Sequence, residues 1–76
     1  MNKARRAILN KILNSLTDLK YDLEVVRDDE EEAKDNMPES LQDSDRYTQM
    51  EEAVDNMYDA LDSLDDAISS LEDAMV

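Results

Sequence analysis

Residues 51–76 read EEAVDNM-YDALDSL-DDAISSL-EDAMV when they are written in blocks of seven. In every complete block the third residue is alanine, and the fourth and seventh residues are large and apolar. Apolar residues that alternate at spacings of three and four fall on one side of an α-helix. The stretch therefore predicts a helix with one continuous apolar side, which serves as a packing surface.

The same spacing extends from Tyr47 to Met75 without a break. We expect a helix over about residues 44–75, with Ser44 as its N-cap and the pair Thr48 and Glu51 as a second capping-box start. Alanines flank the apolar seam on one side and allow a neighbouring helix to approach closely. The residues expected to form an oligomerisation seam are Val54, Met57, Leu61, Leu64, Ile68 and Leu71.

The first half of the chain repeats the heptad spacing and predicts a helix over about residues 3–35. The residues on its seam are Leu9, Ile12, Leu16, Leu19, Leu23, Val26, Ala33 and Met37. Glu30 intrudes at one seam position, either solvated or paired with Lys34 or Arg27 to fix the register. The acidic run Asp28–Glu32 opposes the helix macrodipole, so we expect fraying after Arg27 and leave open whether the run stays helical.

Pro38 separates the two heptad runs, because proline cannot continue a helix. A short turn over residues 36–43 between two long helices predicts an all-α fold, an antiparallel two-helix hairpin of coiled-coil type, as one domain over residues 1–76. A lone hairpin leaves part of these wide apolar sides in water. We therefore expect a homodimer, a four-helix bundle, with a different partner protein in the same place as the alternative.

The composition excludes several kinds of functional site. The chain has no cysteine, histidine or glycine, so it offers no thiolate metal site, no histidine base and no glycine-rich phosphate loop. Paired acids are numerous, but no spacing marks one pair as catalytic. We expect a non-enzyme without cofactor or metal. No apolar stretch is long enough to span a membrane, and the basic N-terminus lacks the features of a signal peptide, so we expect a cytoplasmic location.

The net charge of −13 is distributed unevenly. Residues 1–27 hold six basic and three acidic side chains, whereas residues 47–76 hold nine acidic side chains and no basic one. Direct nucleic-acid binding is therefore disfavoured, and basic partner proteins are favoured. In the antiparallel hairpin, the basic start of the first helix lies beside the acidic end of the second, which supports the pairing.

Acidic residues in the second helix recur at spacings that place them along one ridge. Its members, at steps of three or four residues with an interruption at Ser69, are Glu52, Asp55, Asp59, Asp62, Asp66 and Asp73. Neighbouring side chains at this spacing lie about 5–6 Å apart, which is comparable to the phosphates of one DNA strand. Asp outnumbers Glu in residues 47–76 by six to three, although Asp is the poorer helix former. The ridge is the expected partner-binding site, in its sharpest form a nucleic-acid mimic; the alternative is an ordinary solvated face.

The segment from Glu30 to Ala74 resembles a group of small acidic helical proteins of unassigned function, encoded by gut-type gram-positive bacteria and their phages. The resemblance rests on the turn DNMPESLQDSDR, residues 35–46, and on the repeated acidic tail, residues 51–74. It implies a phage or mobile-element setting, in which small acidic proteins include inhibitors of bacterial defence nucleases. It implies no mechanism.

Two functional hypotheses follow. The first is a protein-binding module that occupies a basic site on a nucleic-acid-binding enzyme, in its sharpest form as an anti-defence inhibitor, with the acidic ridge as its binding surface. The second is a structural or assembly protein in which the heptad seam mediates oligomerisation. Tyr58, and with less support Tyr21, is either a surface residue of the bundle or an aromatic anchor for a partner.

Overall fold

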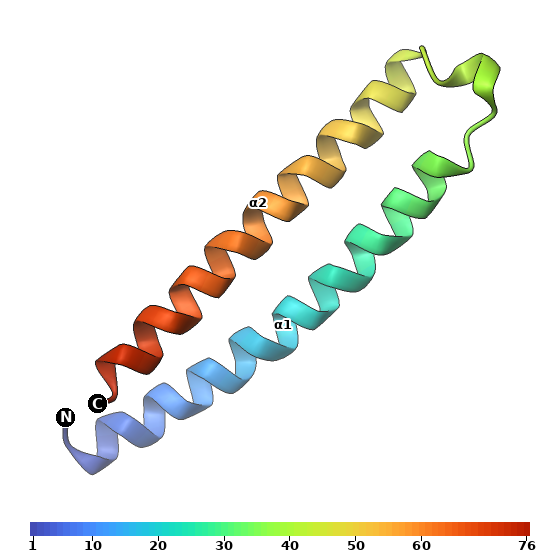
Figure 1. Ribbon diagram of the computed structural model, residues 1–76. Coiled ribbons are helices and arrows are strands. Elements are labelled where there is room, and N and C mark those ends of the chain that lie inside the picture. Colours follow the sequence, from blue (N-terminus) through green and yellow to red (C-terminus); the bar gives the residue numbers. More distant parts are fainter.

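A computed structural model describes residues 1–76 as two long helices joined by a short connector. Helix α1 spans Lys3–Asp35, the 3-10 turn η1 spans Glu39–Leu41, and helix α2 spans Asp45–Ala74. The helices lie side by side and antiparallel, with both termini at the same end of the rod (Figure 1). The rod measures 59 × 15 × 12 Å, which confirms the predicted extended hairpin.

The connector contains no glycine and needs none, since none of its residues has a positive φ. No peptide bond in it is cis. Asn36 caps the end of α1, and Pro38 lies in an extended conformation before η1. The Ser44 side chain then accepts a hydrogen bond from the backbone N–H of Tyr47 at 3.3 Å. Ser44 is thus the N-cap of α2 as predicted, and Thr48 lies inside the helix rather than at a second start.

The heptad prediction for α2 is confirmed. Every seam residue from Tyr47 to Met75 is buried or half-buried, whereas the acidic residues between them are exposed. Val54 and Leu61 are only 3% and 5% solvent-exposed, and Leu13 of α1 is 9% exposed. These three residues form the centre of the core. The seam expected to mediate oligomerisation therefore packs inside the hairpin against α1.

The heptad prediction for α1 is wrong at every second position. Leu9, Leu16, Leu23 and Met37 are half-buried as predicted, but Ile12, Leu19, Val26 and Ala33 are exposed. The next residue along the chain takes the place of each one against α2, and these residues are Leu13, Lys20, Arg27 and Lys34.

Side-chain chemistry explains this rotation of α1 about its axis. Lys20 forms an ion pair with Asp65, and the Arg27 guanidinium lies 4.7 Å from the centre of the Tyr58 ring. Long basic side chains cover apolar surface with their methylene groups while the charged ends reach a partner. Helix α1 has apolar residues on two sides, and either side could pack against α2. The side that does so also carries Lys20 and Arg27, which form these contacts with α2.

The acidic run Asp28–Glu32 stays helical, so the expected fraying is absent. Arg27 donates from Nη2 to Asp28 Oδ1 at 2.9 Å, and Lys34 lies in the last turn, where a cation offsets the macrodipole. Neither cation pairs with Glu30, whose side chain is half-buried. Neither helix is apolar enough over the required length to cross a membrane.

Candidate functional site

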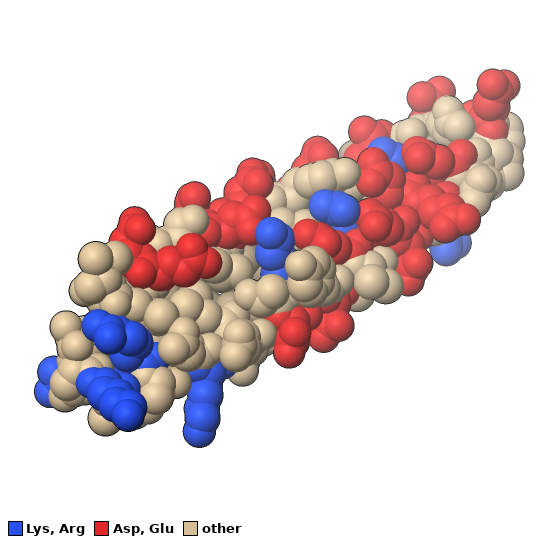
Figure 2. All heavy atoms as spheres, turned by 60° about the horizontal axis from the view of Figure 1, so that its bottom comes forward, with Lys and Arg blue, Asp and Glu red and all other residues tan.

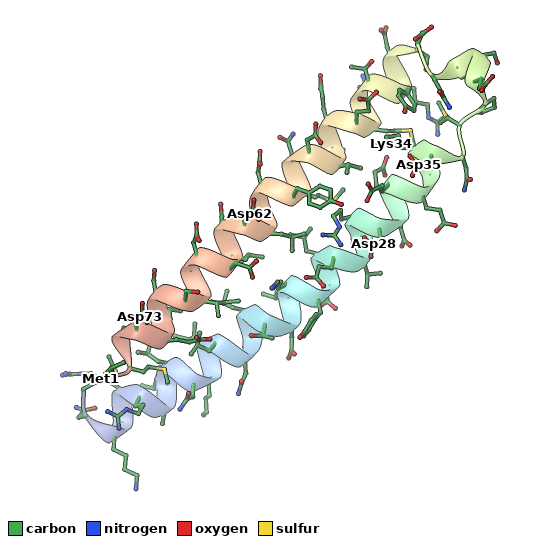
Figure 3. The ribbon with its side chains drawn as sticks, viewed as in Figure 1. Met1, Asp28, Lys34, Asp35, Asp62 and Asp73 are labelled. Atoms are coloured by element: carbon green, nitrogen blue, oxygen red, sulfur yellow. The ribbon has the colours of Figure 1, made fainter.

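The acidic ridge occupies the side of α2 that faces away from α1. All six of its residues, Glu52, Asp55, Asp59, Asp62, Asp66 and Asp73, are exposed. Asp62 and Asp73 lie on the outer side of α2 in Figure 3. An unbroken helix carries the ridge, so its carboxylates are held on a rigid support rather than on a loop.

No cation of the chain neutralises the ridge. The three ion pairs of the structure use Asp65, Asp28 and Asp35, none of which belongs to it. Asp65 lies on the flank of α2 next to α1, where Lys20 reaches it, whereas no residue of the ridge forms an ion pair with α1. The six carboxylates therefore present an uncompensated negative field to solvent.

The dimensions of the ridge can be compared with a nucleic-acid backbone. From Glu52 to Asp73 the helix rises about 32 Å, close to one turn of duplex DNA at about 34 Å. One DNA strand carries a phosphate every ~3.4 Å, so the six carboxylates have a lower charge density than a single strand. Figure 2 shows acidic side chains along much of the rod, with several Lys and Arg side chains at the end that holds the termini and others spread along the rod among the acids.

Tyr58 is engaged within the hairpin, although 42% of it remains exposed. Its hydroxyl donates to Glu31 Oε2 at 3.2 Å, and Arg27 lies over its ring. The hydrogen bond to the Glu31 carboxylate raises the pKa of Tyr58 above its ordinary value. These contacts fit the hypothesis of a surface residue of the bundle better than that of a free aromatic anchor. Tyr21 is 60% exposed.

A row of cations on α1, Lys20, Arg27 and Lys34, lies outside the seam expected from the heptad spacing. These residues recur every seven positions on the side of α1 that faces α2. The hydrogen bond from Lys20 to Asp65 raises the pKa of the lysine. The cations recur every seven residues, and Asp65 and Tyr58, which two of them contact, are also seven residues apart on α2. This shared period is the sequence signal that could have identified the row.

The basic start of α1 contacts the end of α2 through a backbone group rather than through the acids expected there. Arg6 Nε donates to the carbonyl oxygen of Met75 at 3.2 Å, where the final carbonyl groups of a helix lack partners. Lys3, Arg5 and Lys11 form no ion pair. Nowhere do three or more acidic side chains converge as metal ligands.

Comparisons with protein-family models, with curated proteins and with solved structures found no match to this chain. The geometry of the hairpin and its charge distribution are therefore the basis for a functional proposal.

Proposed function

We propose that the chain is a small, non-enzymatic protein-binding module that uses the acidic ridge of α2 to occupy a basic site on a partner protein. The single observation that carries the proposal is that six exposed carboxylates lie along one side of an unbroken helix and none of them forms an ion pair with a cation of the chain. Because like charges at this spacing destabilise a helix slightly, an external cationic surface is the natural partner.

The partner class that fits best is a nucleic-acid-binding enzyme with a basic channel. The ridge is about one duplex turn long and could lie along such a channel in place of a DNA strand. In this form the protein acts as a nucleic-acid mimic, and the resemblance of the turn and tail to phage-encoded acidic proteins is consistent with an inhibitor of bacterial defence.

A capture experiment from host lysate tests the proposal, with washes at low and at high salt and identification of bound proteins by mass spectrometry. The first variant carries Glu52→Gln, Asp55→Asn, Asp59→Asn and Asp62→Asn. A matched control removes four exposed acids outside the ridge through Asp29→Asn, Glu32→Gln, Glu39→Gln and Asp43→Asn.

We expect wild type and the control variant to retain a nucleic-acid enzyme at low salt and to lose it at high salt, because exposed charge pairs are screened. The ridge variant should capture much less of it at low salt. Equal capture by the ridge variant would remove the acidic ridge as the binding surface.

A second candidate function, assembly, is favoured by one further observation. Large apolar residues of α1 remain exposed, including Ile8, Leu19 and Val26. We propose that two hairpins associate into a four-helix bundle. This dimer is compatible with partner binding, since the ridge lies on another side of the rod.

A further inference from the structure

Helix α1 carries an apolar stripe that nothing in the hairpin covers. Ile8, Ile12, Leu19 and Val26 are 58%, 42%, 57% and 56% exposed, and Met1 is 50% exposed. At its N-terminal end the stripe borders an open hollow of about 280 Å³ lined by Met1, Arg5, Ile8 and Leu9. The hollow has room for an apolar side chain of another molecule.

The stripe and the acidic ridge lie on different sides of the rod. Tyr58 contacts Glu31 on one flank of the helix interface, whereas Ile12, Leu19 and Val26 lie on the opposite flank of α1. On that same flank α2 presents the exposed alanines Ala60, Ala67 and Ala74, which let another helix approach. A molecule seated on the stripe therefore leaves the ridge accessible.

The exposed surface of the chain is large enough for a dimer interface. The hairpin exposes 5621 Å², whereas a compact monomer of 8.7 kDa exposes about 4,700 Å². The difference of roughly 900 Å² reflects the elongated shape of the hairpin, and the exposed surface leaves room for the ~800 Å² that each partner buries in an interface of standard size. A second copy of the chain can supply an apolar surface of matching length.

We propose that the stripe packs antiparallel against the same stripe of a second copy, with Arg5 of each copy opposite Asp22 of the other. This inference specifies the interface and register of the dimer in the proposed function, and it rests on that dimer.

The order of residues along the stripe determines which residues of the two copies face each other. Positions that alternate at spacings of four and three read Met1, Arg5, Ile8, Ile12, Ser15, Leu19, Asp22 and Val26. When a second copy runs in the opposite direction, Met1 meets Val26, Ile8 meets Leu19, and Ile12 meets Ser15. The two charged residues of the stripe then meet each other, and neither has an ion-pair partner within its own hairpin.

The charge of α1 within the overlap does not oppose this register, whereas the adjoining part of α2, residues 59–76, adds six acidic side chains, all exposed. The overlap covers residues 1–26, which hold five basic and three acidic side chains. The acidic connector ends project from opposite ends of the dimer, where they are far apart and screened. With about 39 Å of overlap between two 59 Å hairpins, the dimer is about 80 Å long rather than about 60 Å.

Sedimentation equilibrium of the full chain at micromolar concentration tests the interface, with Leu19→Glu and Val25→Glu as a matched pair. Both substitutions place one acid at an exposed aliphatic position of α1, 57% and 60% exposed respectively, but only Leu19 lies on the stripe. We expect Leu19→Glu to raise the dimer dissociation constant more than tenfold and Val25→Glu to leave it near the wild-type value. Circular dichroism checks that both variants keep their helices.

A charge exchange tests the register. Arg5→Asp and Asp22→Arg should each weaken the dimer, because each places like charges opposite one another, and the double variant should restore it. A wild-type chain that stays monomeric at hundreds of micromolar, a dimer indifferent to Leu19→Glu, or a double variant no tighter than the single variants would each overturn the proposal. The four-acid ridge variant should still dimerise, so failure of the dimer and failure of partner binding are distinguishable.

Discussion

At the residue scale, Tyr58 joins the two helices through both its hydroxyl and its ring. The hydroxyl donates to Glu31, and the face of the ring receives Arg27. A carboxylate acceptor stabilises the neutral phenol, and partial desolvation acts in the same direction. The Arg27 charge opposes both effects but does not outweigh them. Tyr58 therefore contributes to hairpin stability while it stays protonated.

Glu31→Gln should lower the pKa of Tyr58 towards its ordinary value of 10.0. Ultraviolet titration of the phenolate measures it, with Tyr58→Phe to subtract the signals of Tyr21 and Tyr47. Because the pKa is raised in the folded state, the stabilisation is present below the unfolded value and is lost as pH rises through the folded value. The melting temperature of wild type should fall more steeply than that of Tyr58→Phe above about pH 10. An unchanged Tyr58 titration in Glu31→Gln would refute the hydrogen bond.

Substitutions of the adjacent residues Ile12 and Leu13 test which side of α1 faces α2. Leu13→Ala should cost about 2–5 kcal/mol of unfolding free energy, because it empties a buried site. Ile12→Ala should cost less than about 1 kcal/mol in the monomer, since the side chain is 42% exposed there. Urea unfolding in a Leu19→Glu background keeps a dimer from burying Ile12. The opposite order of costs would restore the simple heptad for α1.

The residue-level differences between prediction and structure have a physical origin. In α2 apolar residues occupy only one side, so periodicity determines which residues are buried. In α1 apolar residues occupy two sides. The contacts of Lys20 and Arg27 with α2 determine which of these sides is buried. Such pairings depend on the register of a second helix and are invisible to the periodicity of α1 alone. The exposure of the acidic ridge, in contrast, followed directly from its spacing.

At the element scale, the start of α2 is determined by Ser44. Its side chain satisfies the N–H of Tyr47, one of four that lack a partner inside the helix. Ser44→Ala should therefore lower the unfolding free energy by about 1 kcal/mol. Thr48→Ala is the control, because Thr48 lies within α2 and only its hydroxyl donates to Ser44 O at 3.4 Å. Thermal or urea unfolding compares them, and a larger loss in Thr48→Ala would place the helix start at Thr48.

The length of α1 shows how tertiary contacts override a local tendency. The run Asp28–Glu32 alone opposes the helix macrodipole. In the hairpin, Asp28 accepts from Arg27 and Glu31 accepts from Tyr58 of the facing helix. The second of these contacts exists only when α2 is present, so the fraying expected from α1 alone does not occur.

At the scale of the whole molecule, the rod separates its surfaces by side. The facing sides of the two helices pack against each other. An outer side of α1 is apolar, and the outer side of α2 is acidic. Several basic side chains lie at the end that holds the termini, and others lie along the rod (Figure 2). Because the surfaces are separate, the proposed dimer and the proposed binding of a basic partner do not compete for the same side of the rod.

The central claim is that the acidic ridge replaces nucleic acid on its partner, and competition with DNA tests it most directly. The measurement is the fluorescence anisotropy of a labelled duplex bound to the captured enzyme while the chain is added. Wild type and the four-acid control variant should release the duplex, whereas the variant neutralised at Glu52, Asp55, Asp59 and Asp62 should not. Equal release by that ridge variant would contradict the account, as would a duplex that stays bound at saturating wild-type chain.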